Sequence, residues 1–230
     1  MPEEELFPIR PTQNWILHHG FAAWAPQLLP DAWAGMSQTE HFFGPQASID
    51  DFVYYQRLMQ AEGYKAIFEE ARRQKPYCSM ALNWCYHHPW KVAAGHSLLL
   101  YPAVVTPAYH AAADAMRPTL ASARICKFAW TTGEIFHAQL WLLNDAPAPA
   151  ADCISAYLEL DGQEQFLLEW QTGTVPENTN QIGPELNITL PSCSGNTFRL
   201  VLRSQHGFDS SYTLCYQRKK SVPEKKGLNM

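Results

Sequence analysis

The hydrophobic pattern in the first half of the chain is clearest over residues 48–74. Ser48, with Asp51 three residues later, resembles a helix capping box with a shorter acid. Cations gather at the end of the stretch, where they suit the negative end of a helix dipole, and Pro76 stops the pattern. The apolar positions recur at spacings close to three and four, which predicts an amphipathic helix: Phe52, Tyr55, Leu58, Tyr64, Ile67, Phe68 and Ala71.

A nearly continuous apolar run follows this helix, from Tyr77 to Tyr86. A short run of this kind, between a helix and a Pro-Trp turn, is typical of a strand that a parallel sheet buries on both faces. A second helix is predicted at about 107–116, because a proline occupies its first position and another closes it. Helix, buried strand, long loop and helix is the order of a (β/α) repeat.

After Pro118 the pattern changes to period two. Turn signals such as Asp161-Gly162 separate short apolar segments. Seven strands at this spacing predict an antiparallel β-sandwich, with a domain boundary near Pro118. The segments are Ser122–Phe128, Phe136–Leu143, Ile154–Leu160, Gln165–Trp170, Leu186–Leu190, Thr197–Leu202 and Tyr212–Gln217.

The first 47 residues show few clear periods, so we expect short helical turns and loops there, packed over something larger. A complete (β/α)₈ barrel needs roughly 200 or more residues, whereas 118 precede the sandwich. The chain therefore either has another fold or starts part-way through a barrel.

Composition narrows the class of protein. Of the 230 residues, 47% are hydrophobic and 17% charged, which allows a packed core. Eight Trp are present, and such rings build cores but also form platforms for sugar rings. A net charge of -5 without a basic stripe argues against nucleic acid, and no apolar stretch approaches the ~20 residues of a membrane span. The first ten residues are acidic and lack a signal-peptide pattern. Because a fragment need not carry the signal peptide of its parent, the sequence does not predict a cellular compartment.

Several short motifs follow one another between Gln56 and Pro118. They are Gln56, Gln60–Lys65, Glu69–Arg73, Leu82–Tyr86, Pro89-Trp90, Thr106–Tyr109 and Arg117-Pro118. Their order resembles the end of the catalytic barrel in glycoside hydrolase family 2, which includes β-galactosidases, β-glucuronidases, β-mannosidases and exo-β-glucosaminidases. Members of that family have a barrel strand ending in Trp, an Asn-Asp or Asn-Glu pair, another Trp, a Lys-Pro-x-Tyr helix and an immunoglobulin-like sandwich.

The resemblance implies a retaining mechanism with two glutamates, an acid/base and a nucleophile, ~5–5.5 Å apart. In the family both lie upstream of the Trp-bearing strand, so both are expected before residue 1. Glu40, in the string Glu40–Gly44, is nearest to the family's nucleophile motif. A polar loop, Ala34–Thr39, precedes it instead of an apolar strand. Glu40 is therefore a minor candidate nucleophile, and a plain loop carboxylate is the simpler interpretation.

The resemblance also implies a substrate-binding set: Trp84, Tyr86, His87, His88 and Trp90. Trp84 would floor the subsite for the cleaved sugar, since a side chain at the end of a barrel strand points into the active-site face; a core Trp is the alternative. Tyr86 and Trp90 would rim the pocket. His87 and His88 replace the family's Asn-Asp or Asn-Glu, which suggests altered specificity or a lost function. Adjacent histidines project in different directions, so neither a metal nor a cofactor is expected.

Two functions remain open for this α+β multidomain chain. The first is a fragment or subunit of a retaining, exo-acting β-glycosidase that binds a β-linked glycoside and is not catalytically competent alone. Its parts would be a partial (β/α)₈ TIM-barrel remnant over 1–118, an immunoglobulin-like β-sandwich over 119–218 and a flexible basic tail over 219–230. Its partner would be the missing N-terminal barrel portion or a second copy. The alternative is a non-catalytic carbohydrate-binding or scaffolding module.

Overall fold

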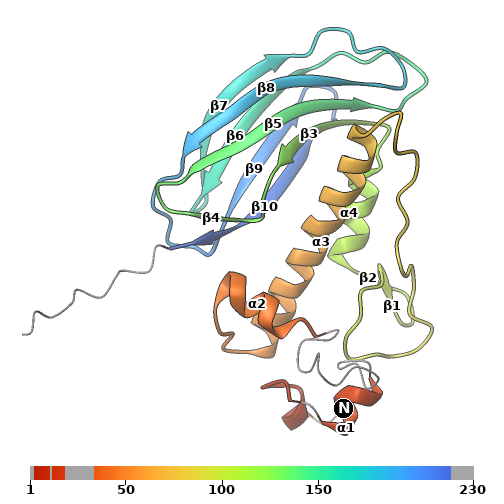
Figure 1. Ribbon diagram of the computed structural model, residues 1–230, viewed down its shortest axis with the longest axis vertical. Helices are drawn as coiled ribbons and strands as arrows, with labels where there is room; N and C mark the ends of the chain where they lie inside the picture. The colour runs from red at the N-terminus through yellow and green to blue at the C-terminus, as the bar shows by residue number, and fades with distance from the viewer. Residues whose placement is uncertain (1–2, 11, 19–33, 219–230) are drawn as a thin grey trace, which may run out of the picture.

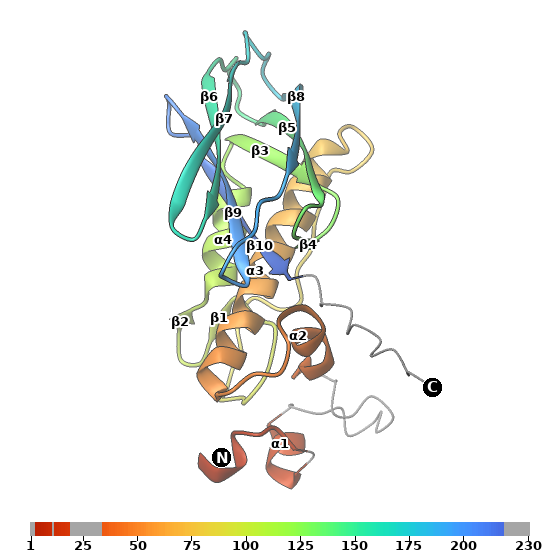
Figure 2. The same cartoon turned by 90° about the vertical axis from the view of Figure 1, so that its left-hand side faces the viewer.

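The computed structural model describes residues 3–10, 12–18 and 34–218. A sandwich of two sheets forms one end of the molecule, and two packed helices stand beneath it (Figures 1 and 2). The N-terminal elements lie at the end farthest from the sandwich. The protein is thus mixed α+β, and the predicted basic tail, 219–230, lies outside the described residues.

Both predicted helices are present. Helix α3 spans Ile49–Arg73, and the Ser48 hydroxyl caps it by accepting from the Asp51 N–H at 3.1 Å. Helix α4 spans Pro107–Ala115 and begins at the expected proline. The two helices pack together through small and aromatic side chains, among them Ala108 and Phe68. None of the helices that the structure describes is long and apolar enough to cross a membrane.

Shorter helices precede α3, as expected: η1 (Glu3–Glu5), α1 (Gln13–Leu17) and α2 (Met36–Phe43). The polar loop expected over Ala34–Thr39 is wrong, because α2 starts within it. A tertiary contact explains the difference: the Gln56 side chain of α3 donates to the Gly35 carbonyl at 2.8 Å, directly before α2 begins. Residues 19–33, which carry several of the expected apolar anchors, are outside the described residues.

All seven predicted strands are present, each overlapping its expected range. The strands after the helices are β3 (Thr119–Ile125), β4 (Ala129–Thr131), β5 (Ile135–Asn144), β6 (Cys153–Leu160), β7 (Gln163–Gln171), β8 (Thr179–Thr189), β9 (Thr197–Ser204) and β10 (Ser210–Gln217). The strands form two sheets, in the orders β4-β10-β9-β6-β7 and β3-β5-β8. The expectation of a purely antiparallel sandwich is wrong at one place, since β4 pairs with β10 in parallel.

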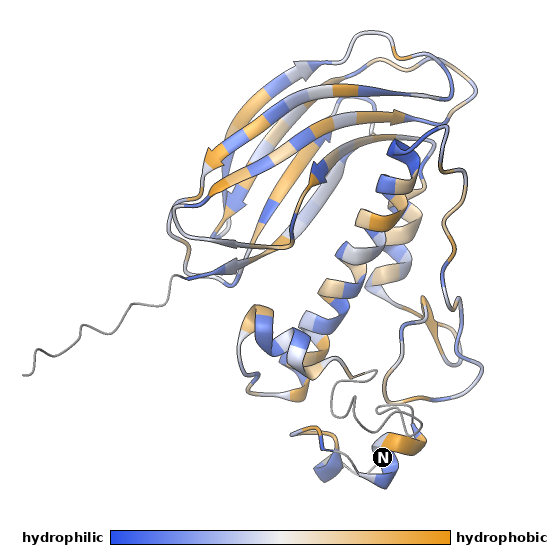
Figure 3. Ribbon diagram, viewed as in Figure 1, coloured by the Kyte–Doolittle hydropathy of each residue, from blue (hydrophilic) through white to orange (hydrophobic). Residues whose placement is uncertain are grey.

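Alternation along the strands builds the sandwich core. In β5 the side chains at positions 136, 138, 140 and 142 are fully buried, whereas those at positions 137, 139 and 141 are half-buried on the opposite face. The Phe136 ring meets Trp130 and Phe198 edge-on, with ring centroids 5.0 and 5.4 Å apart. Figure 3 shows this alternation as bands of polar and apolar colour along the strands. Each sheet therefore has one face in an apolar core and one face free for other contacts.

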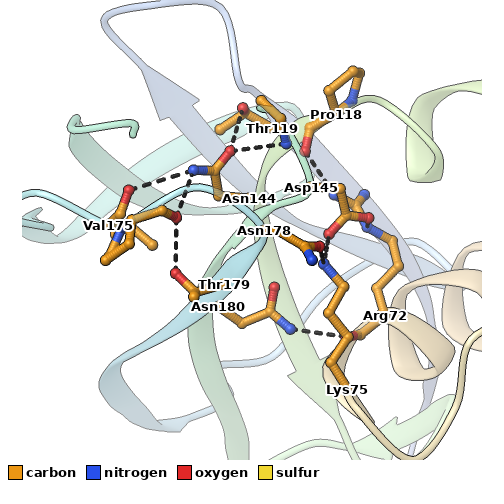
Figure 4. A network of polar contacts seen from close by, with 12 residues as sticks. Arg72, Lys75, Pro118, Thr119, Asn144, Asp145, Val175, Asn178, Thr179 and Asn180 are labelled. Carbon is orange, nitrogen blue, oxygen red and sulfur yellow. Dashed lines mark hydrogen bonds and ion pairs between the residues drawn. The ribbon is translucent and has the colours of Figure 1, made fainter. Parts of the chain in front are cut away.

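A polar network ties the end of α3 to the sandwich (Figure 4). Arg72 Nε donates to Asp145 Oδ2 at 2.9 Å, and Lys75 Nζ pairs with the other oxygen of the same carboxylate. Lys75 also donates to Asn178 Oδ1 at 3.0 Å, and Asn180 donates to the backbone oxygen of Arg72 at 2.8 Å. The cations at the end of α3 therefore have two roles: they suit the helix dipole, and they hold α3 on the sandwich.

A buried ionic cluster lies one turn earlier on α3. Glu69 and Arg73 form an ion pair at 3.0 Å, with side chains only 2% and 4% exposed. Glu69 also accepts from the Tyr212 hydroxyl at 2.7 Å and from the Ser122 hydroxyl. Burial raises the pKa of Tyr212, so the phenol keeps the proton that it donates. Because Ser122 belongs to β3 and Tyr212 to β10, the cluster joins α3 to both sheets.

The expectation of a buried strand over Tyr77–Tyr86 is wrong. This segment runs beside the helices without helical structure or sheet pairing (Figure 1). Its end meets a short hairpin of β1 (Leu99–Leu100) and β2 (Val104–Val105), where the Leu99 N–H donates to the Tyr86 carbonyl at 2.9 Å. The error arises because a short apolar run has the same composition whether or not a sheet covers it.

Candidate functional site

The predicted sugar-site residues lie on one segment, 77–90, beside the helices. Exposure alternates along it: Met80, Leu82, Trp84 and Tyr86 are 67%, 84%, 80% and 56% exposed, and the residues between them are half-buried. This is the two-faced pattern of a strand. Trp84 is therefore not a core residue, because its indole lies on the surface.

Contacts to α3 hold the other face of the segment. Asn83 Nδ2 donates to the Tyr64 hydroxyl oxygen at 2.8 Å, and that hydroxyl donates to the His96 carbonyl at 3.3 Å. Cys85, two residues on, is also half-buried. Since neighbouring residues in an extended chain point to opposite sides, these contacts turn Trp84 toward solvent.

Two residues of α3, Gln60 and Tyr64, were not predicted to position the site. Gln60 Nε2 donates to the His96 carbonyl at 2.8 Å, the same oxygen that Tyr64 reaches. Burial lowers the pKa of the His96 imidazole. A signal existed in the sequence, because residues four apart share one face of a helix. Together they fasten the loop after Trp90 to the helix that also holds Asn83.

The two adjacent histidines have different surroundings. His87 Nε2 lies 3.0 Å from the Pro102 carbonyl oxygen in the β1–β2 hairpin. His88 is buried, and its backbone N–H donates to the Leu99 carbonyl at 3.1 Å. A Cβ at Gly95 would lie 2.1 Å from His88 Cε1, so the ring packs directly against that glycine. His88 thus supports the loop from inside, whereas His87 lies nearer to the surface.

Gly95→Ala tests this packing. The added methyl group would collide with the His88 ring, and overpacking of this kind costs about 1–3 kcal/mol, which urea unfolding should show as a lower free energy of unfolding. Gly63→Ala is the matched control, because a Cβ there meets nothing within 4 Å. In the middle of α3 that change should stabilise the protein by roughly 0.5–1 kcal/mol. If both variants were stabilised, the His88 ring would have room to move aside.

Trp90 and Glu40 complete the predicted residues. Trp90 is 58% exposed, so the segment carries four exposed aromatic side chains: Tyr77, Trp84, Tyr86 and Trp90. Glu40 is exposed on α2, which lies on the opposite side of α3 from this segment (Figure 1). The structure therefore places the aromatic candidates on one segment and leaves Glu40 apart from them.

The buried acidic side chains of α3 line a different feature. A groove of about 1100 Å³ separates α3 from the outer face of the β3–β5–β8 sheet, with Trp141 and Ile182 on the sheet side and Glu62 and Glu69 on the helix side. Burial raises the pKa of Glu62, against the opposing charge of Lys65 at 2.8 Å. Both glutamates are engaged in hydrogen bonds and ion pairs, so neither resembles a free nucleophile. Within the described ranges, no group of three His, Cys, Asp or Glu side chains could hold a metal ion.

The fold has a counterpart among solved structures. No protein-family model matches the sequence, and no curated protein matches it. A complex of the Amycolatopsis orientalis exo-chitosanase with PNP-β-D-glucosamine superposes on 79% of this chain, with a TM-score of 0.54 and 20% identity. The likeness is one of fold. It covers 21% of the exo-chitosanase chain, so this protein spans about a fifth of that structure's length.

Two other structures are more distant. A β-glucosidase from Listeria innocua in complex with isofagomine has a TM-score of 0.31 at 9% identity, over 43% of this chain and 16% of its own. A CARDB domain from Pyrococcus furiosus has a TM-score of 0.35 at 5% identity, over 43% of this chain and 87% of its own. Likeness at this level carries no functional meaning.

Proposed function

We propose that this protein forms one wall of a β-glycoside-binding pocket, as a fragment or subunit of an exo-acting glycosidase of family 2 type. The observation that supports it best is Trp84, an indole that is 80% exposed while Asn83 anchors the backbone beside it to α3. An aromatic face held in this way is a platform on which a sugar ring stacks. The shared fold with an exo-chitosanase supports a sugar as the ligand.

In this proposal residues 1–118 correspond to the end of a (β/α)₈ barrel, and Tyr77–Tyr86 to its last strand. Alternating exposure is what such a strand has when helices cover one face and the barrel interior on the other face is missing. Trp84 then lies toward the end of the strand that carries active-site residues in such barrels. The two catalytic glutamates come from polypeptide outside this sequence, so the chain alone does not turn over substrate.

Sugar binding by the chain itself is the test. Saturation-transfer NMR with methyl β-D-glucosaminide should show binding to the wild-type protein. Trp84→Ala should bind roughly tenfold more weakly, because one aromatic contact contributes about 0.5–1.5 kcal/mol beyond its buried area. Phe166→Ala is the matched control, at an aromatic side chain of β7 that is 55% exposed, and should bind like the wild type. Equal binding by all three proteins would remove Trp84 from the proposed pocket.

The catalytic part of the proposal has its own assay. The isolated chain should not hydrolyse aryl β-glycosides. Turnover that Glu40→Gln abolishes would place the nucleophile inside this chain and contradict the proposal. Sugar binding and hydrolysis therefore report on separate parts of it.

A non-catalytic binding or scaffolding role has one observation in its favour. The groove beside α3 exposes Ile182 next to Trp141 on the outer face of the sandwich, and Ile182 is 57% exposed. An apolar surface of this kind is typical of protein contacts. Sugar binding that survives Trp84→Ala but not Trp141→Ala would favour this second function.

A further inference from the structure

The backbone of residues 79–84 has no partner strand. Their N–H and C=O groups make no backbone–backbone hydrogen bond within the described part of the chain. The segment runs along the side of the helices (Figure 1), and only its first residues, 79–81, share a groove with the β3–β5–β8 sheet. A row of unpaired peptide groups is a ready template for pairing with another strand.

The side chains of the same segment leave an apolar row open to solvent. Met80, Leu82 and Trp84 are each more than 60% exposed and lie on one face, because alternate residues of an extended chain share a face. Between Lys75 and Lys91 the sequence has no Asp, Glu, Lys or Arg. Charged side chains are the usual protection of an exposed strand edge against a second strand, and this edge lacks them.

We infer that residues 80–84 form the interface of a homodimer, in which two copies of this segment pair as antiparallel strands about a two-fold axis. Such a contact is self-complementary, since one surface meets its own copy. In a register centred on Leu82, Leu82 lies opposite Leu82 of the second copy, and Met80 lies opposite Trp84 of the second copy. Opposite pairs in an antiparallel ladder have their Cβ atoms about 4.5–5.5 Å apart, so these apolar side chains touch.

The lack of charge on the segment fits a second copy. Each copy contributes one aromatic and two aliphatic side chains, so the contact belongs with the small interfaces, below about 1,200 Å², that give weak, concentration-dependent association. No like charges face each other across the axis, because the nearest charged side chains in the sequence are Lys75 and Lys91. Edge pairing joins the two strands through their backbones and leaves one face of each strand open. In this register Met80 of one copy lies beside Trp84 of the other.

This inference does not depend on the proposed sugar pocket, although it involves the same segment. A polypeptide that supplied neighbouring barrel strands would need the same backbone edge. Self-pairing and binding of such a polypeptide therefore exclude each other, whereas a sugar stacked on the indole face of Trp84 does not compete with edge pairing.

Sedimentation velocity of the whole chain tests the dimer. The wild-type protein should shift from 26.1 kDa toward twice that mass as its concentration rises through the micromolar range. Leu82→Lys should remain monomeric, because it places two ammonium groups opposite each other on the axis. Leu17→Lys is the matched control: Leu17 is 64% exposed on α1, outside the segment, so its variant should dimerise like the wild type.

Hydrogen exchange locates the contact. The alternate amides of residues 79–84 that face the second copy should exchange at least tenfold more slowly in the wild-type protein at high concentration than in Leu82→Lys. A wild-type chain that stays monomeric, with these amides exchanging freely, would overturn the inference and leave the edge to a different polypeptide. A dimer that Leu82→Lys does not weaken, or assembly that continues beyond two copies, would also overturn it.

Discussion

Glu69→Ala is expected to lower the free energy of unfolding by about 3–5 kcal/mol, because removing one partner of a buried ion pair leaves the other charge uncompensated. The Arg73 side chain is only 4% exposed and donates to Glu69 at 3.0 Å. The hydroxyl groups of Tyr212 and Ser122 would lose the same acceptor. The substitution therefore disrupts the contact between α3 and both sheets at once.

Urea denaturation measures this loss, and Glu70→Ala is its control. Glu70 also pairs with Arg73, at 3.3 Å, but its side chain is 33% exposed. Partly exposed pairs contribute about 0–1 kcal/mol, so the control should be close to the wild type. If Glu69→Ala prevents folding, Glu69→Gln keeps an acceptor in place and should give a measurable, smaller loss. Similar values for the Glu69 and Glu70 variants would show that burial does not set the strength of the cluster.

Phe136→Ala is expected to cost about 3–5 kcal/mol, the usual range for removing a buried aromatic side chain from a core. Phe136 is fully buried in β5 and contacts Trp130 from β4 and Phe198 from β9, so the cavity would open between the two sheets. Phe166→Ala, at an exposed ring of β7, should change the free energy of unfolding by less than about 0.5 kcal/mol. Thermal unfolding of both variants gives the comparison, and a small loss for Phe136→Ala would mean that the two sheets close over the cavity.

These two variants act far from the segment that carries Trp84. That segment depends on Tyr64 and Gln60 of α3, and α3 depends on the Glu69 cluster for its place on the sandwich. The Phe136 variant weakens the sandwich core, which takes no part in the contacts that hold segment 77–90 on α3. At equal concentrations of folded protein, Glu69→Ala should therefore bind the sugar more weakly than Phe136→Ala.

The sequence predicted the elements whose periodicity and turns are local. Ser48 and Pro76 bound the helix that became α3, and alternation marked the strands that became β5, β6 and β9. In each case one face meets a core, so the spacing of apolar residues follows the geometry of the backbone. Strand β8 starts seven residues before its predicted start, at Thr179, because its first half is largely polar and lacks the apolar alternation that predicts a strand.

Tertiary contacts decided the rest. The run Tyr77–Tyr86 has the composition of a buried strand, yet Leu82 and Trp84 are exposed, and no local pattern distinguishes the two cases. Glu69 and Arg73 lie four residues apart on α3, and their burial depends on contacts with Ser122 and Tyr212, which are distant in sequence. The prediction that Trp84 belongs to a site came from the family resemblance. Composition alone allows a core Trp equally well.

The indole N–H signals of the eight Trp residues test the proposed site most directly. Titration with methyl β-D-glucosaminide should shift the Trp84 signal most in a two-dimensional ¹H–¹⁵N NMR spectrum, followed by that of Trp90, with the signal of buried Trp130 unchanged. Substitution of each Trp by Phe assigns the signals. Shifts confined to Trp130, Trp141 or Trp170 of the sandwich would contradict a sugar-binding wall built on Trp84.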